Sequence, residues 1–386
     1  MNLYDGKPWV EVGFVERLNR FVMRFEMDSG EIVDAHAANP GRMEEFRVPG
    51  HRFFLIPVDG GKYSYRVVST VYQGSYVLLD TIKVNYVVER LLRGRKIAGL
   101  EDYPVIRREV SMARSKFDFK LSNENKGVKP VMLEVKSCNL VHGGVAMFPD
   151  APTDRGRRHL EDLDALAGSG EVETALLYLI TNYNARVFMP NRHTDPEYCR
   201  TMAGLKGCRS HAFRLKLTDP VTVDLDSLEA VPIDLKTPVR HCGDNGSYLL
   251  VMRNVKEAEV KVGALGKRTF APGYYVYVGS AMKGLEARVK RHRLKTKKVR
   301  WHIDYVLPAV MEIEKVFMIR SKERQEEGLA RRMMGIAPSF VAGFGASDTE
   351  LDSHLFYFGE EKPWQRRDFL DLLLDFQMGE GLTEGV

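Results

Sequence analysis

Cysteine is scarce in this chain, with four in 386 residues, at positions 138, 199, 208 and 242. Neither a disulfide scaffold nor a zinc site of paired C-x-x-C motifs fits so few cysteines at such irregular spacing, so we expect reduced thiols. The sequence also has no apolar run approaching the ~20 residues that a membrane-spanning helix needs. A secretory signal is not expected either, because Asp5 and Glu11 interrupt the N-terminal stretch. These absences predict a cytoplasmic protein without a membrane partner.

The net charge is also small for a chain of this length, at +5. A mildly basic protein is compatible with nucleic acid but does not require it, so the position of the cations matters more than their total. A chain of 386 residues exceeds one ordinary hydrophobic core. We therefore expect two or three domains.

Two short apolar segments carry acidic residues at the spacing of a metal-dependent nuclease site. Residues 131–136 predict a β-strand in which Glu134 and Lys136 emerge on one face, while the alternate apolar residues face a core. Asp118 lies between two phenylalanines of the preceding segment. Two converging carboxylates can hold Mg²⁺ or Mn²⁺, and a neighbouring lysine can position water or neutralise phosphate charge. The alternative is an exposed strand face, where such ion pairs contribute little.

Four motifs surround these residues: NPGRM at 39–43, FDF at 117–119, LEVKS at 133–137 and AMFPDAPTDRGRRHL at 146–160. Together they resemble the sugar fermentation stimulation protein family, over residues 10 to 220 or so. The resemblance implies a small oligonucleotide-binding (OB) barrel followed by a domain of the PD-(D/E)xK nuclease type. It also supports Asp118 and Glu134 as metal ligands and Lys136 as the catalytic lysine.

The first 84 residues predict the barrel independently of that resemblance. Short runs of alternating apolar and polar residues are separated by turn sequences such as those at 28–30 and 59–61. Barrels of this type hold a phosphate backbone with cations and stack bases on aromatic rings. Arg42, together with Arg17, Arg20 and Arg52, fits that use. The alternative is a solvated surface around a core.

Residues 85–225 alternate strand and helix patterns, which predicts an α/β domain. A helix over 81–98 leads into it, with Glu89 at the edge of the site. Buried strands are predicted over 173–181 and 184–189. Acidic and proline-containing stretches after residue 218 then predict a linker, which we place at 226–243.

A second helix is predicted over 155–167, since leucines recur at helical spacing and Thr153 or Asp154 can cap its N-terminus. The N–H groups at such a helix start can bind an anion. Thr153, Arg155 and His159 are therefore candidate phosphate contacts. His159 is equally compatible with a packed or capping role.

A second candidate site follows in residues 244–386. Strand patterns over 246–252 and 273–280 lead into a basic helix, in which Arg288 and His292 lie four residues apart and share a face. WHIDY at 301–305, FGASD at 344–348 and SHL at 353–355 follow. This organisation resembles the GIY-YIG nuclease superfamily over residues 246–358.

That second resemblance implies roles for five residues. Tyr248 and Tyr277 would line the site, with one of them helping to activate water. Arg288 would bind the scissile phosphate, and Glu326, or alternatively Glu327, would bind a divalent metal. The sequence departs from the pattern in the long gap between the tyrosines and in Thr349 and Leu351, where this branch is expected to have cysteines. Without the resemblance, the tyrosines also fit a strand core with hydroxyls at its edge.

Residues 288–300 contain eight Lys and Arg residues and no acidic residue. Beside a phosphodiesterase site such a run predicts a phosphate-binding arm whose binding is salt-sensitive. The residues expected to contact nucleic acid are Lys290, Arg291, His292 and Arg293. A solvated face is the alternative.

The sequence thus predicts a multidomain α+β and α/β protein with an OB-like barrel (1–84), a PD-(D/E)xK-like domain (85–225) and a GIY-YIG-like domain (244–386). The expected function is nucleic-acid binding, with DNA as the expected partner, and hydrolysis of phosphodiesters with Mg²⁺ or Mn²⁺. The alternative from another class is a non-catalytic DNA-binding regulator linked to sugar metabolism. The sequence does not distinguish DNA from RNA by itself.

Overall fold

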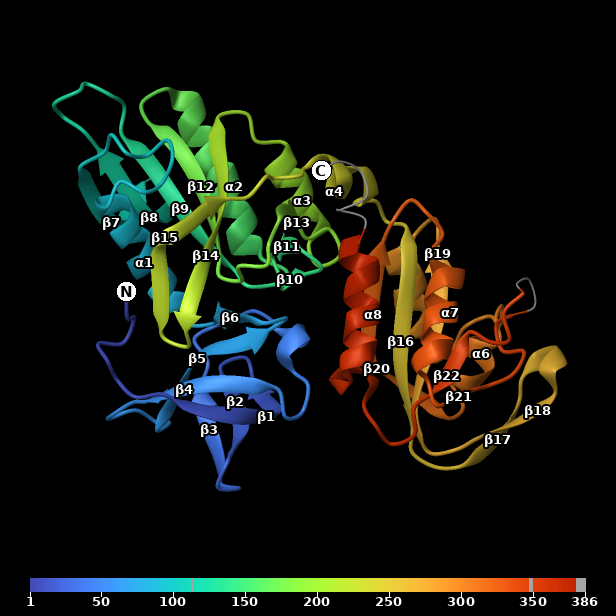
Figure 1. Cartoon of the computed structure of the whole chain (residues 1–386). Coiled ribbons are helices and arrows are strands. Elements are labelled where there is room, and N and C mark those ends of the chain that lie inside the picture. The colour runs from blue at the N-terminus through green and yellow to red at the C-terminus, as the bar shows by residue number, and fades with distance from the viewer. Residues whose placement is uncertain (113, 347–349, 380–386) are drawn as a thin grey trace. The chain divides into compact units, whose positions relative to one another are not determined.

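The computed structural model describes residues 1–112, 114–346 and 350–379. These residues form two compact units, divided between Val239 and Arg240 (Figure 1). Part of the predicted FGASD motif, together with Thr349, lies outside the described residues. No helix in the described ranges is long and apolar enough to span a membrane.

The first unit begins with a six-stranded sheet that closes on itself. Its strands are β1 (Val10–Asn19), β2 (Val22–Met27), β3 (Ile32–His36), β4 (Arg52–Pro57), β5 (Tyr65–Tyr72) and β6 (Ser75–Leu78), with a short 3₁₀ turn at Glu44–Phe46. They pair in the order β3-β2-β1-β4-β5-β6, and a parallel pairing of β3 with β5 closes the barrel. Alternation along the strands brings Phe14, Phe25 and Phe53 together inside it. The predicted barrel is confirmed.

Helix α1 (Thr81–Arg93) connects the barrel to the central sheet. Asp80 caps its start by accepting the N–H of Ile82. The prediction of a helix to residue 98 is wrong at the C-terminal end, because the helix ends at Arg93 with Gly94 as its C-cap. The sheet contains β7 (Val105–Met112), β8 (Ser115–Ser122), β9 (Val131–Cys138), β12 (Glu173–Ile180), β14 (Cys208–Asp219) and β15 (Thr222–Ala230).

The central sheet has the order β15-β14-β12-β9-β8-β7, with β9, β12 and β14 parallel. Parallel strands are buried on both faces. Val131 and Leu133 of β9 pack in a cluster with α1, whereas Met132 packs in a second cluster with the following helix. Glu134 shares the face of Met132, and because that face is covered Glu134 is only 4% exposed.

Helix α2 (Asp154–Ser169) supplies that cover. As predicted, Thr153 is its N-cap, and the Thr153 hydroxyl accepts the N–H of Gly156. Smaller elements complete the unit: β10 (Val141–His142), β11 (Val145–Phe148), β13 (Val187–Pro190) and α3 (Pro196–Ala203). The end of β15 and helix α4 (Lys236–His241) occupy much of the stretch assigned to a linker.

The second unit contains a five-stranded sheet of order β20-β16-β19-β22-β21. Its strands are β16 (Gly246–Asn254), β19 (Gly273–Ala281), β20 (Met311–Arg320), β21 (Ser339–Phe340) and β22 (Leu355–Tyr357), beside a hairpin of β17 (Ala258–Lys261) and β18 (Lys267–Phe270). The helices are α5 (Leu285–His292), α6 (Ile303–Val306), α7 (Glu326–Ile336) and α8 (Arg367–Met378), with 3₁₀ turns at Gly263–Leu265 and Pro363–Gln365. The mixed α/β architecture matches the prediction.

Asp304 organises the basic stretch that follows α5. Its carboxylate is buried and accepts two hydrogen bonds from Arg291, at 3.0 and 2.9 Å. It also accepts the backbone N–H groups of Arg300 and Trp301. Burial alone would raise the pKa of Asp304, but these four hydrogen bonds lower it below its usual value.

Replacing Asp304 should therefore destabilise the second unit. Asp304→Asn leaves Arg291 without its carboxylate, and breaking a buried ion pair costs ~3–5 kcal/mol. Tryptophan fluorescence during urea unfolding would measure this, with the exposed Glu360→Gln as control. Because the folded pKa is lowered, the contribution of Asp304 is present above its unfolded pKa, ~3.9, and is lost as the pH falls through the folded pKa. The difference between wild type and variant should shrink on acidification, and an unchanged difference would contradict the assignment.

Candidate active site

Glu134 is the centre of the first candidate site. Its Oε1 atom accepts hydrogen bonds from Lys136 Nζ at 2.6 Å and from His159 Nδ1 at 2.5 Å. Lys136 lies two residues along the same strand, and His159 comes from α2, which packs over that strand. Burial alone would raise the pKa of Glu134, but the charge of Lys136 and the hydrogen bond from His159 lower it overall. The carboxylate is therefore held ionised.

Asp118 is the second acid of the site. Its Oδ2 accepts the backbone N–H of Val135 at 2.8 Å, and its Oδ1 accepts Nδ2 of Asn85 at 2.7 Å. Burial raises the pKa of Asp118, and the charge of Glu134 raises it further. Asp118 therefore lies close enough to Glu134 for the two charges to influence each other.

One carboxylate oxygen of Glu134 has no hydrogen-bond partner among the described residues. This oxygen is Oε2, and it is buried. A buried anionic oxygen without a partner is costly, and a cation there would remove both that cost and the repulsion from Asp118. The donor set fits Mg²⁺ or Mn²⁺, which prefer carboxylate oxygens. Within the described ranges, no group of three or more His, Cys, Asp or Glu side chains is placed to hold a metal. A metal held by Asp118 and Glu134 would keep water and substrate oxygens as its other ligands.

The three residues predicted to contact phosphate at the start of α2 have different surroundings in the structure. His159 is buried and bonded to Glu134, and the exposed Arg155 donates from Nε to His159 Nε2 at 3.4 Å. Thr153 acts as a cap, so its hydroxyl is already used. Glu89 pairs with Arg93 and Arg108 rather than with the site. Arg42 is exposed on the barrel loop at 39–43.

Asn85 is the residue that sequence reasoning missed. It lies on α1, in the stretch where only Glu89 was considered, and it holds Asp118 in place. A polar residue one turn before Glu89 could have been noticed, but the sequence does not tell which of the two faces the sheet.

The second unit brings together Tyr248, Tyr277, Arg288 and Glu326. The Tyr248 hydroxyl lies 2.8 Å from Nε2 of His292, and the two tyrosine rings are 6.4 Å apart. Gly279 makes room for this arrangement, because a Cβ atom there would lie 2.5 Å from the Tyr248 ring. Burial raises the pKa of both tyrosines, so neither is a ready base. Burial lowers the pKa of His292 to about 4, so this histidine is neutral near pH 7.

Arg288 and Glu326 lie beside that pair. The Arg288 guanidinium is 4.1 Å from the centre of the Trp301 ring and donates to the carbonyl of Ser280 at 3.1 Å. The Ser280 hydroxyl donates to Oε2 of Glu326, and His354 Nδ1 lies 3.7 Å from Oε1. Glu327, the alternative ligand, is exposed. Ser280 is a further residue to which sequence reasoning assigned no role.

The basic run divides into buried and exposed members. Lys290 and Arg293 face solvent. Arg291 is engaged by Asp304, and His292 is buried against Tyr248. Two of the four expected nucleic-acid contacts are therefore exposed, and two are built into the domain.

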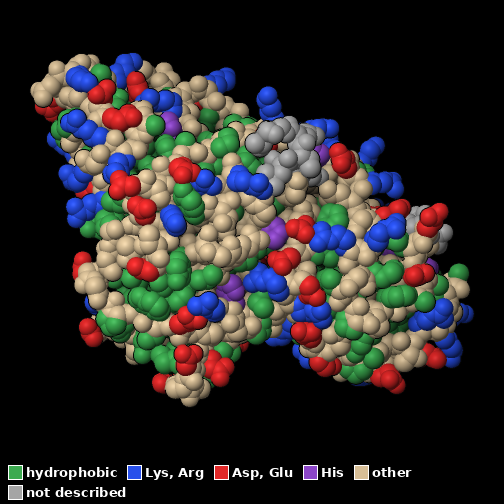
Figure 2. Space-filling model, in the orientation of Figure 1, with side chains coloured by type: hydrophobic (Ala, Val, Ile, Leu, Met, Phe, Trp, Pro, Cys, Tyr) green, Lys and Arg blue, Asp and Glu red, His purple; other side chains and the backbone are tan. Residues whose placement is uncertain are grey.

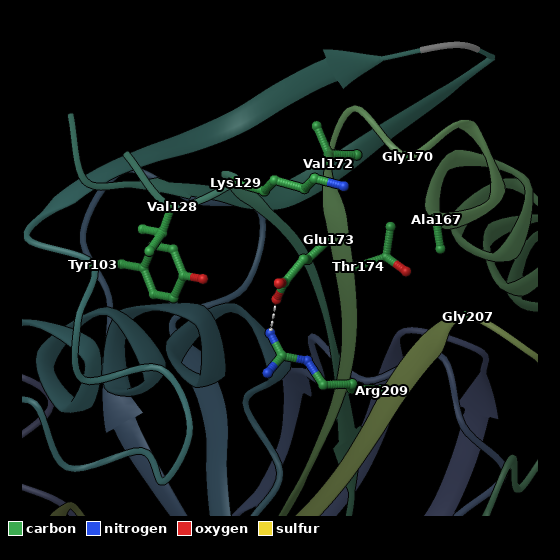
Figure 3. A pocket seen from close by; sticks show the side chains of 10 residues that line it. All are labelled: Tyr103, Val128, Lys129, Ala167, Gly170, Val172, Glu173, Thr174, Gly207 and Arg209. Carbon is green, nitrogen blue, oxygen red and sulfur yellow. Dashed lines mark hydrogen bonds and ion pairs between the residues drawn. The ribbon is translucent and has the colours of Figure 1, made fainter. Parts of the chain in front are cut away.

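A separate hollow of about 610 Å³ lies at the amino ends of the parallel strands β9, β12 and β14 (Figure 3). Lys129 and Tyr103 line it, and an ion pair joins Glu173 to Arg209 across it. None of the predicted site residues is among its described lining residues. It is therefore distinct from the Asp118–Glu134 site.

Comparison with known proteins finds matches for three successive segments of the chain. Residues 15–79 match the SfsA N-terminal OB domain, and residues 83–219 match the sugar fermentation stimulation protein RE domain. Residues 247–372 match a domain of unknown function, DUF123.

Members of the same family match half or more of the chain. A sugar fermentation stimulation protein homolog of Desulforamulus reducens is 36% identical over 195 residues, which cover 50% of this chain and 80% of the relative. The homolog of Chloroflexus aggregans is 34% identical over 242 residues, covering 60% and 91%. The solved structure of Pyrococcus furiosus SfsA in complex with Ca²⁺ is 26% identical with a TM-score of 0.54, and covers 61% of this chain and 99% of that one.

The fold supports the same assignment as these matches, because the first unit contains both the barrel and the central sheet that carries Asp118 and Glu134. The chain belongs to the sugar fermentation stimulation protein family, and carries a GIY-YIG-like domain after the part that the family shares.

Proposed function

We propose that this protein binds nucleic acid and hydrolyses its phosphodiester bonds at the Asp118–Glu134–Lys136 site, using Mg²⁺ or Mn²⁺. The observation that carries the proposal is the state of Glu134. One of its oxygens is fixed by Lys136 and His159, and the other is buried without a partner in the part of the chain described, next to Asp118. In a purely structural ion pair, both carboxylate oxygens of Glu134 would be expected to have partners.

The chemistry divides among these residues. Asp118 and Glu134 would hold the metal, which when bound lowers the pKa of water and stabilises charge on the phosphate. Lys136 places an ammonium where that charge develops. His159 fixes the Glu134 carboxylate, and the exposed Arg155 attracts the phosphate of the substrate. The Pyrococcus furiosus SfsA structure is a complex with Ca²⁺, another ion that prefers oxygen ligands, which supports the choice of metal class.

The barrel offers a place for bases to stack. Phe21 is 46% exposed, and its ring lies nearly parallel to His36 with centroids 6.4 Å apart. The Arg20 guanidinium is 5.7 Å from the Phe21 ring. Aromatic rings with nearby cations bind single strands with little sequence preference. The visible surface of both units mixes Lys and Arg with Asp and Glu (Figure 2), so binding would depend on such local groups rather than on one large basic field.

The second unit is proposed as a second phosphodiesterase centre on the same substrate. Neutral His292 accepts a hydrogen bond from the Tyr248 hydroxyl, which would orient the tyrosine oxygen as an acceptor for a water. Arg288 would bind the phosphate and Glu326 a divalent metal, while Lys290 and Arg293 would contact neighbouring phosphates. We expect DNA as the substrate and the cytoplasm as the location.

A non-catalytic DNA-binding regulator is the competing function. The observation in its favour is that Glu134 already has an ion pair with Lys136 and a hydrogen bond from His159 without a metal. Binding without cleavage would support it.

Removing Lys136 should abolish cleavage by the first site. Loss of one charge-stabilising donor typically lowers the rate ~10²–10³-fold. Cleavage of labelled single- and double-stranded DNA and RNA would be measured with Mg²⁺, Mn²⁺ or EDTA, comparing Lys136→Ala and Arg288→Ala with Lys120→Ala on the adjacent strand β8 as control. Loss in Lys136→Ala but not in the control assigns the chemistry to this site, and loss only in Arg288→Ala assigns it to the second unit. Binding without any cutting would favour the regulator.

Asp118→Asn should stabilise the metal-free protein and diminish its response to metal. Because the folded pKa of Asp118 is raised, its ionised form opposes folding as the pH rises above the unfolded value. Mg²⁺ at 100 times its Kd would stabilise the wild type by about 2.7 kcal/mol. Thermal unfolding with and without Mg²⁺ tests both effects, with the exposed Asp59→Asn as control. An undiminished Mg²⁺ response in Asp118→Asn would place the metal elsewhere.

Phe21→Ala should weaken binding of single strands. Stacking on one aromatic ring contributes ~1–3 kcal/mol per base. Fluorescence anisotropy with a labelled oligonucleotide measures the loss, and Phe340→Ala, at an exposed phenylalanine of the second unit, is the control. Equal affinities for all three proteins would exclude Phe21 from the binding surface.

A further inference from the structure

A second, smaller pocket lies directly beside Lys136. Its volume is about 190 Å³, and it is enclosed between the barrel loop at 39–41 and the carboxyl end of β9. Lys136 and Asn139 line one side, and Pro40 of the barrel lines the other. Drug-sized ligand pockets begin near ~300 Å³, so this one accommodates a single ring system rather than a whole nucleotide.

The barrel loop is fixed in place over the pocket. The Arg17 guanidinium donates to the carbonyls of Gly41 and Arg42, both at 2.6 Å. The N–H of Met43 donates to Asp150 at 3.2 Å, and Gly41 lies so close to the Asp150 carboxylate that a Cβ atom there would clash with it. The loop therefore needs little reordering before a ligand binds, which lowers the entropic cost of binding.

The pocket walls suit a flat, polar and uncharged group. Phe148, Leu140 and Met147 supply apolar surface, and the Phe148 ring is supported by the rings of two tyrosines, with centroids 5.7 and 5.5 Å away. Asn139 is 6% exposed, and its Nδ2 has no hydrogen-bond partner among the described residues. An amide donor between apolar walls can donate a hydrogen bond to the edge of an unstacked base while the walls contact its faces.

A bare phosphate fits this pocket less well. Lys136 would attract it, but the carboxylate of Asp150 also lines the pocket and would repel it. The two charges favour a neutral group that carries both donors and acceptors, as a nucleobase does.

We propose that this pocket holds one unpaired nucleobase of the substrate strand while the adjacent phosphate occupies the Asp118–Glu134–Lys136 site. The inference rests on the proposed nuclease function and specifies its substrate: a base in an intact duplex cannot enter the pocket without leaving its partner. The enzyme therefore acts on single strands, strand ends or unpaired nucleotides, and the barrel takes part in selecting them through the loop at 39–41.

The test combines variants of Asn139 with substrates that each lack one base. Cleavage by the full-length protein with Mn²⁺ is measured on a single-stranded oligonucleotide, on a duplex closed by hairpins at both ends, and on single strands with one abasic residue at each position in turn. Asn139→Leu fills the pocket, Asn139→Ser enlarges it, and Asn184→Leu, at a half-buried asparagine that does not line it, is the control.

The single strand should be cut about tenfold or more faster than the closed duplex, and one abasic position should lower the wild-type rate about tenfold. At that position Asn139→Leu and Asn139→Ser should show no further loss, whereas Asn184→Leu should behave as wild type. Equal cutting of closed duplex and single strand, or the same abasic sensitivity in the Asn139 variants as in wild type, would overturn the pocket proposal while leaving the nuclease function intact. Absence of both binding and cutting would overturn the two together.

Discussion

The structure of the first unit depends on how it keeps Glu134 ionised inside a sheet. A carboxylate on a central strand of a covered sheet loses its water, which is costly unless an opposite charge and hydrogen-bond donors replace it. Lys136 and His159 do so through one oxygen only. The remaining oxygen and the neighbouring Asp118 leave excess negative charge, and that charge is what makes the site suited to a cation.

The surrounding elements fix the positions of Glu134 and Asp118, and with them the excess negative charge. Helix α2 covers the face that carries Glu134 and supplies His159, while α1 reaches the other acid through Asn85. The barrel closes the same region from a third side, where its loop is anchored to Asp150. Fold and site are therefore built from the same contacts, and the barrel contributes directly to the surroundings of Lys136.

Much of this could be predicted from the sequence, because local patterns determine it. The alternation around Phe14 and Phe25, the Thr153 cap and the strand that carries Glu134 depend on neighbours in the chain. What could not be predicted depends on tertiary contacts. The burial of Glu134 requires knowing that α2 covers its face, Asn85 requires the orientation of α1, and the division of the basic run requires the contact of Arg291 with Asp304.

Anomalous diffraction from crystals grown with Mn²⁺ tests most directly whether the two acids form a metal site. We expect an anomalous peak beside Asp118 and Glu134, the two acids that would hold the metal, with Oε1 of Glu134 still bonded to Lys136 and His159. That peak should be lost in Glu134→Gln. Crystals with no peak at the acids, at Mn²⁺ concentrations that support any cleavage, would contradict the metal site and would leave Glu134 as part of a structural ion network.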